Sequence, residues 1–273
     1  MTYLTELPAR GVIEIAGEDR VSFLQGLVSN DVEQVAAETA VWAGLLTPQG
    51  KYLADFFILT DGNALLLDCE RAQIPMLAPK FSRYRLRAKV TVLIRDDLRV
   101  GAAWGANAPN AEIVAPDPRL AGAGWRLLSA VPFTANATPE DWDRHRLALA
   151  LPDGTRDLEV DKTVLLEAGF DELRGLSWTK GCYMGQELTA RTKYRGLLKR
   201  RLVPVAAEGD LPASGTPVLR DGVEVGTLRS SRNGIGLAVL RLDAIGAPLS
   251  AAGKLLTAHM PAWAISPAEP ANQ

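Results

Sequence analysis

The sequence contains very few of the side chains that bind soft metals. Its 273 residues include two cysteines, Cys69 and Cys182, and two histidines, His145 and His259. Zinc sites and iron–sulfur clusters usually take about four such ligands, so we expect no resident metal in this chain alone. The cysteines are far apart and form no CxxC pair, which excludes a disulfide framework and indicates a reducing compartment. His145, on a predicted helix between two arginines, is expected to face solvent.

A leader and long apolar runs are also missing. The first residues, MTYLTELPARGVIEIAG, lack the basic start and apolar core of a signal peptide, and no apolar stretch is long enough to span a membrane. We therefore expect a cytoplasmic protein without membrane contact. The net charge of −2 disfavours general nucleic-acid binding, so no direct nucleic-acid partner is expected. We also expect a monomer.

Length and composition indicate about two globular domains. The N-terminal part predicts mixed structure, with a helix over residues 18–31 and apolar strands over 11–17, 42–47, 52–60 and 64–69. From about residue 197, short β-rich runs alternate with Gly, Pro and Asn turns, a pattern typical of a small barrel. The predicted division is a first domain, a barrel and a flexible tail, over 1–196, 197–262 and 263–273.

The octapeptide KGCYMGQE, residues 180–187, gathers a thiol, an amine, an amide and a carboxylate between two glycines. The glycines free the backbone around Cys182, and the helix-forming run QELTARTKY follows directly. Lys180 and the helix N-terminus would both favour the thiolate. A free cysteine is often simply a small core residue. The crowding of polar groups favours a presented site, because a core segment would show apolar periodicity.

A basic run accompanies this octapeptide. Seven basic residues lie between Lys180 and Arg201, against one acid, Glu187. The simplest interpretation of this basic run is a surface exposed to solvent, and the more specific interpretation is a binding site for an anionic ligand. Tyr194 is the single aromatic residue within the run from Arg191 to Arg201, so stacking platforms for RNA are scarce and an RNA-binding function ranks low.

KGCYMGQE followed by TARTKYRG resembles the signature of the YgfZ family of folate-binding proteins. That family is related to the glycine-cleavage T-protein, an aminomethyltransferase, and to mitochondrial iron–sulfur cluster assembly factors. The segments GEDRVSFLQGLVSND, LLTPQGKYLADFFI, KFSRYRLRAKV and GVEVGTLRSS are similar to the same families, so the resemblance covers about residues 11–260. It implies an α+β fold, a T-protein-like folate-binding region of interleaved ferredoxin-like halves with a small C-terminal β-barrel.

The resemblance implies tetrahydrofolate as the ligand. In T-proteins an acid in an LEAG segment holds the pterin ring, and Glu167 matches that acid in this sequence. Asp55 matches one of two adjacent acids in the early hairpin of T-proteins, and the other is absent here, which puts aminomethyl transfer in doubt. Gln186, Glu187 and Arg191 are assigned to the same folate-binding region, where Gln186 and Glu187 would position the loop or cap the following helix.

The T-protein counterpart of KGCYMGQE lacks the cysteine, whereas in the YgfZ family this residue is associated with maintaining iron–sulfur enzymes, including those that thiolate tRNA. The leading hypothesis is therefore a tetrahydrofolate-binding accessory protein that assembles or repairs iron–sulfur clusters in client proteins. Cys182 would act on the client cluster, and Lys180 would hold the thiolate. The alternative is a folate-dependent one-carbon transferase.

Overall fold

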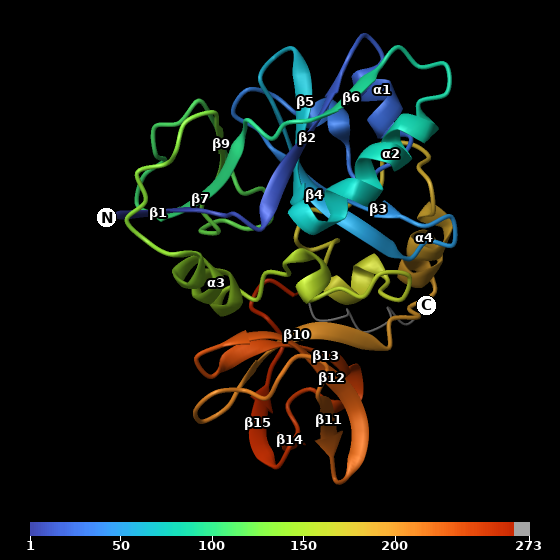
Figure 1. Ribbon diagram of the computed structural model, residues 1–273. Coiled ribbons are helices and arrows are strands. Elements are labelled where there is room, and N and C mark those ends of the chain that lie inside the picture. Colours follow the sequence, from blue (N-terminus) through green and yellow to red (C-terminus); the bar gives the residue numbers. More distant parts are fainter. Residues whose placement is uncertain (265–273) are drawn as a thin grey trace.

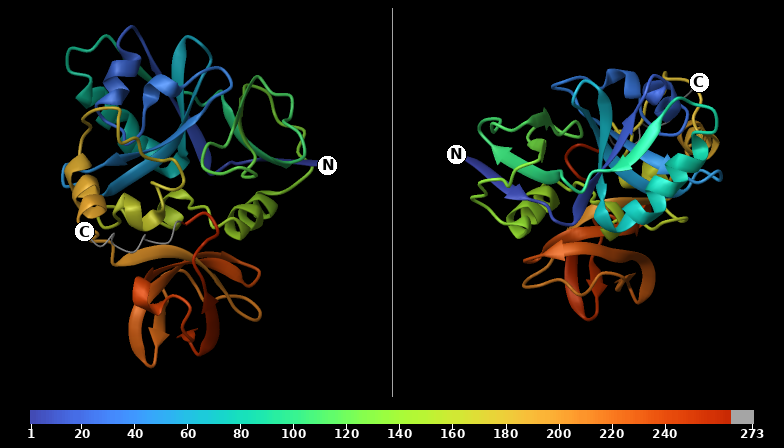
Figure 2. Two further views of the ribbon diagram at one scale, coloured as in Figure 1. Left: turned by 180° about the vertical axis from the view of Figure 1, so that it is seen from behind. Right: turned by 45° about the horizontal axis from the view of Figure 1, so that its top comes forward.

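The computed structural model describes residues 1–264 and contains two open β-sheets, a closed β-barrel and the helices between them (Figure 1). Residues 265–273 lie outside the described residues, and most of the predicted tail falls there. In Figure 1 the barrel, in orange and red, lies below the two sheets, and Figure 2 shows the same arrangement from behind. This is the α+β architecture with a C-terminal barrel that the sequence predicts.

A five-stranded antiparallel sheet has the order β3-β4-β5-β2-β6. Its strands are β2 (Arg10–Ala16), β3 (Val41–Leu46), β4 (Tyr52–Thr60), β5 (Ala64–Glu70) and β6 (Thr91–Ile94). Its two helices are α1 (Arg20–Gln25) and α2 (Ile74–Tyr84). Side chains alternate between faces, so Phe56 packs with Leu24 and Phe81 of these helices, and Phe57 enters a second core on the opposite face.

A four-stranded antiparallel sheet, in the order β1-β7-β9-β8, shares that second core. Its strands are β1 (Thr2–Glu6), β7 (Arg99–Gly105), β8 (Ile113–Pro116) and β9 (Trp125–Ser129), and helix α3 (Pro139–Ala148) follows. Trp104 of β7 and Trp142 of α3 both belong to the shared core. Helix α3 begins at a capping box, in which Thr138 and Asp141 exchange side-chain and backbone hydrogen bonds.

The first part of the segment between α3 and the barrel, in yellow in Figure 1, lies between the sheets and the barrel, and the later part with α4, in gold, lies beside the five-stranded sheet. The whole segment contains the 3₁₀ turns Gly154–Arg156 and Leu165–Ala168 and helix α4 (Gln186–Tyr194). The remaining 3₁₀ turns are Val32–Gln34, Arg71–Gln73 and Leu242–Ala244. This segment carries both Glu167 and Cys182.

The C-terminal barrel closes in the order β10-β13-β12-β11-β14-β15, with β15 pairing back onto β10. Its strands are β10 (Arg200–Ala206), β11 (Pro217–Arg220), β12 (Val223–Arg232), β13 (Ile235–Arg241), β14 (Leu249–Ala251) and β15 (Lys254–Ala258). Apolar side chains such as Val203, Leu228 and Leu240 fill its interior. Leu147 of α3 packs with Leu237 of β13, which joins the barrel to the rest of the molecule.

Two local predictions are wrong. The helix predicted over residues 18–31 ends at Gln25, because Ser29 turns away to hydrogen-bond Gly44 and Gly175, both distant in sequence. His145 does not face solvent freely: its ring stacks on Trp104 at 5.5 Å between centroids, and burial lowers the pKa of the imidazole. In both cases tertiary contacts outweigh a local pattern.

Candidate functional site

The loop that precedes α4 presents Cys182 to solvent as a free thiol. Gly181 and Gly185, on either side, both have left-handed backbone angles, with φ of 96° and 80°. A Cβ on Gly185 would lie 2.5 Å from the carbonyl oxygen of Thr47, whereas a Cβ on Gly181 would meet nothing within 4 Å. Gly185 is therefore required for close packing against the β3–β4 turn, and Gly181 faces open space.

This loop is fastened to the segment that follows α1 by bonds from four points along its length. The hydroxyl of Ser29 donates to the Gly175 carbonyl oxygen (2.6 Å), and the backbone amide of Ser177 donates to the Ser29 carbonyl oxygen (3.1 Å). The amide of Met184 donates to the carbonyl oxygen of Gly26 (3.1 Å). Residues 175–184 thus lie along residues 26–30, and the thiol is offered from an anchored loop.

Lys180 supplies the fourth point of attachment. Its Nζ donates to the carbonyl oxygens of Val28 and Asn30, both at 2.7 Å, and lies 5.4 Å from the centre of the Tyr183 ring. Burial lowers the pKa of the Lys180 amine to about 8, and nearby Asp31 acts in the opposite direction. The amine is therefore engaged by backbone oxygens, and its contacts assign it to positioning the loop rather than to the predicted pairing with a thiolate.

The two polar residues that start α4 have different surroundings. The Oε1 atom of Gln186 accepts a hydrogen bond from the backbone amide of Tyr183 (3.2 Å), which closes the turn that directly follows Cys182. Glu187 is exposed in the first turn of the helix, where its negative charge interacts favourably with the positive end of the helix dipole. Among residues 1–264 there is no group of three or more His, Cys, Asp or Glu side chains placed to hold a metal ion.

Glu167 lies in the turn Leu165–Ala168, largely covered by the first barrel strand. One carboxylate oxygen accepts from the backbone amide of Val164 (3.3 Å), and the other lies 3.4 Å from Nε of Arg200 on β10. Both oxygens of the predicted pterin anchor are thus engaged by this chain itself. Their contacts fix the turn and connect it to the barrel.

Asp55 is buried in β4, at 4% exposure. Its carboxylate accepts from the indole nitrogen of Trp42 and from the hydroxyl of Tyr52, both at 2.8 Å. Trp42 in turn stacks on Phe170, with ring centres 3.9 Å apart. Burial raises the pKa of Asp55, and the positive charge of Arg10 acts in the opposite direction. The carboxyl group is enclosed by aromatic side chains.

The residues predicted to bind tetrahydrofolate differ in how far they are open to a ligand. Asp55 is enclosed within the sheet core and is not placed to reach a ligand, whereas each oxygen of Glu167 makes one contact, with Val164 or Arg200, and a carboxylate oxygen can accept a second hydrogen bond. Arg191 is exposed on α4. Folate binding stays a prediction.

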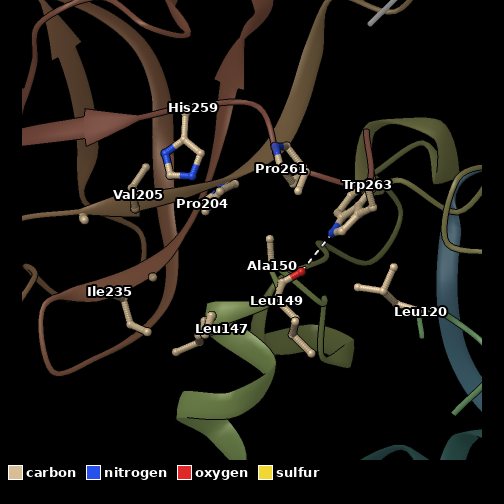
Figure 3. Close-up of a pocket in the computed structure, with 14 residues that line it drawn as sticks. Leu120, Leu147, Leu149, Ala150, Pro204, Val205, Ile235, His259, Pro261 and Trp263 are labelled. Carbon is tan, nitrogen blue, oxygen red and sulfur yellow. Dashed lines mark hydrogen bonds between the residues drawn. The ribbon is translucent and has the colours of Figure 1, made fainter. Parts of the chain in front are cut away.

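An apolar cleft of about 450 Å³ lies elsewhere, between the end of α3 and the barrel (Figure 3). Leu147 and Leu149 line one side and Val205 lies opposite. Trp263 bounds one end, where its indole nitrogen donates to the Leu149 carbonyl oxygen (2.9 Å), and His259 lies at the other. None of the predicted site residues lines this cleft, so it is separate from the Cys182 loop.

Comparison with known proteins identifies the family. Residues 199–265 match the CAF17 C-terminal beta-barrel domain. The chain is 34% identical to the human mitochondrial iron–sulfur cluster assembly factor IBA57, over 94% of this chain and 84% of that protein. The chain belongs to the IBA57 family. The mouse member is 33% identical over 89% of this chain and 78% of its own length. The predicted kinship with mitochondrial iron–sulfur assembly factors is confirmed, and the narrower resemblance to YgfZ stays a prediction.

A solved structure confirms the fold class of this IBA57-family chain. The aminomethyltransferase T of the glycine cleavage system from Bartonella henselae superposes with a TM-score of 0.76, over 96% of this chain and 86% of that one. The sequence identity is 12%, so the match shows the fold alone. The predicted T-protein-like region with a C-terminal barrel is therefore correct.

The predicted cytoplasmic location is wrong by the same comparison, because the IBA57 relatives are named as mitochondrial proteins. A low cysteine count argues against an oxidising compartment, but it does not distinguish the cytoplasm from an organelle. Within residues 1–264, no helix is both long and apolar enough to cross a membrane.

Sequence reasoning missed Asp171 and Trp178, which form the surroundings of the Cys182 loop. One carboxylate oxygen of Asp171 accepts from the Trp178 indole nitrogen (2.8 Å), and the other pairs with the amine of Lys193. Lys193 is 22 residues away from Asp171, so no local spacing marks this contact. A tryptophan four positions before a candidate reactive cysteine was the available signal.

Proposed function

We propose that this protein supports the assembly or repair of iron–sulfur clusters on client proteins, with the thiolate of Cys182 as a transient ligand to the client's cluster. The observation that carries the proposal is an exposed, unpaired thiol on a loop tied to residues 26–30. Membership of the IBA57 family supports it. We include tRNA-thiolating enzymes among the clients because the octapeptide resembles the YgfZ signature.

The surroundings of Cys182 suit a visiting cluster better than a resident one. A cluster usually takes four thiolate ligands, and the described residues offer one exposed cysteine, because Cys69 is buried at the end of β5. The remaining ligands therefore come from the client. A thiol displayed on the surface can reach a metal centre held by another protein, whereas a thiol inside a closed pocket cannot.

The test is complementation of a strain lacking its own copy of the protein, with Cys182→Ser compared against wild type. We expect the serine variant to lose most support of cluster-dependent enzymes, measured as aconitase activity and as tRNA thiolation, because a hydroxyl is a poor ligand for iron. Its free energy of unfolding should stay within about 0.5 kcal/mol of wild type, since the side chain is exposed. Full support by Cys182→Ser would overturn the proposal.

The buried cysteine supplies the matched control. Cys69→Ala removes the other thiol of the chain, and we expect it to retain support of both enzymes at a modest cost in stability. If both cysteine variants fail equally while remaining folded, the effect is not specific to the exposed loop.

A further inference from the structure

A surface of aromatic and basic side chains adjoins the Cys182 loop. It comprises Trp178, Arg191, Lys193, Tyr194 and Arg195, and we call it the α4 surface. Trp178 is 39% exposed and Tyr194 is 78% exposed. Large aromatic side chains with this much exposed area are typical anchors of protein–protein contacts. The α4 surface lies next to the thiol in the chain, and the proposed function does not explain it.

The aromatic residues of the α4 surface are held in fixed positions. The Trp178 indole donates to Asp171, and the amine of Lys193, which pairs with the same carboxylate, lies 5.8 Å from the Trp178 ring centre. Tyr194 meets Trp178 edge to face, with ring centres 6.0 Å apart. Because these contacts already restrict the rings, docking a partner costs less side-chain entropy than ordering free ones would.

Of the three basic residues of the α4 surface, Lys193 pairs with Asp171, whereas the two arginines lack a carboxylate partner within the described chain. Across residues 1–264, Arg191 and Arg195 have no carboxylate within 4.0 Å, although most other arginines of the molecule are paired. Arg195 is the C-cap residue of α4 and follows Arg191 by four positions, so the two lie on the same side of the helix end, while Thr189 and Thr192 face the core. This exposed positive charge is complementary to an acidic partner.

A groove extends the α4 surface on the side of the loop. Its volume is about 610 Å³, and its lining includes Trp178 and Thr179, close to Cys182 in the chain, together with Arg174, Asn30 and Pro118. Trp178 therefore belongs both to the groove and to the α4 surface. A partner seated in the groove and on α4 would also contact the loop that carries the thiol.

We propose that the α4 surface is the docking site for an acidic protein that carries the iron–sulfur cluster. Trp178 and Tyr194 bury against it, Arg191 and Arg195 pair with its carboxylates, and its cluster comes within reach of Cys182. This inference rests on the proposed function, whose site it extends to a partner class. A nucleic acid is also anionic, but Trp178 and Tyr194 meet edge to face and do not form the stacking platform on which successive bases bind.

The charge of the partner is tested with synthetic peptides. Each peptide carries one cysteine as a mixed disulfide with thionitrobenzoate, and one is rich in Glu whereas its match is rich in Lys. The Cys182 thiolate attacks the peptide sulfur, a protein–peptide disulfide forms, and coloured thionitrobenzoate leaves with the electron pair of the broken bond. At low salt we expect the Glu peptide to react about tenfold faster with wild type, because opposite charges raise encounter rates.

Charge reversal of the α4 surface supplies the decisive comparison. In Arg191→Glu/Arg195→Glu the preference should shift to the Lys peptide. In the control, Arg144→Glu/Lys254→Glu, two exposed basic residues on α3 and the barrel are reversed and the preference for the Glu peptide should persist. Equal rates for both peptides in wild type, or an unchanged order in the reversed variant, would overturn the inference.

Complementation separates this inference from the proposed function. We expect Trp178→Ser/Tyr194→Ser to lower support of cluster enzymes at least fivefold, while iodoacetamide alkylates Cys182 as fast as in wild type. The control is Val223→Ser/Leu255→Ser, which removes two exposed apolar side chains of the barrel. This variant should support the cluster enzymes as well as wild type does.

The outcomes of that experiment differ for the two ideas. If Cys182→Ser fails but the aromatic and charge-reversed variants both support fully, the docking site is wrong and the proposed function stands. If Cys182→Ser supports fully, the proposed function itself is wrong. Salt-dependent tRNA binding by wild type that is lost in Arg191→Glu/Arg195→Glu would identify a nucleic acid as the occupant and overturn the protein partner.

Discussion

At the scale of single residues, Asp55 is a buried acid whose partners belong to the core. Its carboxylate accepts hydrogen bonds from Trp42 and Tyr52, which lie in the same cluster of buried side chains as Phe170. Removing such an acid alters packing and hydrogen bonding around the aromatic side chains. The geometry therefore assigns Asp55 to stability, and nothing in it favours the one-carbon transferase alternative.

This assignment predicts the pH dependence of stability. Burial raises the pKa of Asp55 in the folded state. At a pH above the ordinary pKa of an aspartate, the folded protein therefore keeps this proton when the unfolded chain has released it. Stability contributed by the protonated form is present at low pH and is lost as pH rises through the folded pKa. Relative to Asp55→Asn, which does not titrate, wild type should gain stability as pH falls from 7 toward 4, measured by urea unfolding. A constant difference across this range would contradict the assignment.

Lys180 shows the limit of prediction at this scale. The sequence places its amine two residues from Cys182, and proximity in the chain suggested an ion pair with the thiolate. The acceptors that it finds are the carbonyl oxygens of Val28 and Asn30, about 150 residues earlier. Backbone oxygens carry no mark in the sequence, so this role becomes visible only when the fold brings the two segments together.

At the scale of elements, strands and helices with a strong local pattern were predicted well. The β4 strand, Tyr52–Thr60, and helix α4, Gln186–Tyr194, have the boundaries expected from apolar runs and helix formers. The strands Thr2–Glu6 and Trp125–Ser129 were missed because each is five residues long, and Thr2–Glu6 pairs with β7, which is distant in sequence. The exposed Cys182 loop was correctly predicted from its two glycines, whereas its anchors were not.

Those two glycines allow a matched test of the loop. Gly185→Ala adds a Cβ 2.5 Å from the Thr47 carbonyl oxygen at a left-handed backbone position, so strain and a steric clash combine. We expect the free energy of unfolding to fall by about 2–4 kcal/mol and the start of α4 to be displaced. Gly181→Ala causes backbone strain but no steric clash, so we expect its free energy of unfolding to fall by about 1 kcal/mol.

Urea unfolding measures both glycine variants, and hydrogen exchange of the Met184 amide reports the loop itself. Met184 donates to the Gly26 carbonyl oxygen, so its exchange should accelerate in Gly185→Ala more than in Gly181→Ala. Equal effects of the two substitutions would show that the contact with the β3–β4 turn does not hold the loop.

At the scale of the whole molecule, a buried ionic cluster joins the barrel to the sheets. Arg146 of α3, at 1% exposure, donates to Asp143 (2.7 Å), to Asp157 (2.6 Å) and to the hydroxyl of Ser230 on β12 (2.7 Å). Arg232 of the same strand donates to Asp143 at 3.0 Å. Because these charges are removed from water, their attraction is weakly screened. We expect the barrel and the N-terminal α+β region to unfold as one cooperative unit.

The last prediction removes the centre of that cluster. Arg146→Met leaves Asp157 buried without its arginine, and losing one partner of a buried pair costs about 3–5 kcal/mol. Arg144→Met, an exposed neighbour on α3, is the control, and its effect should stay within about 0.5 kcal/mol. Five of the six tryptophans lie in the N-terminal α+β region and Trp263 lies at the junction with the barrel, so fluorescence follows mainly the N-terminal region while far-ultraviolet circular dichroism follows the whole chain. In wild type the two thermal transitions should coincide, and in Arg146→Met they should separate as the barrel loses its coupling. Coincident transitions in Arg146→Met, with a loss below about 1 kcal/mol, would show that apolar contacts such as Leu147 with Leu237 join the two parts without this cluster.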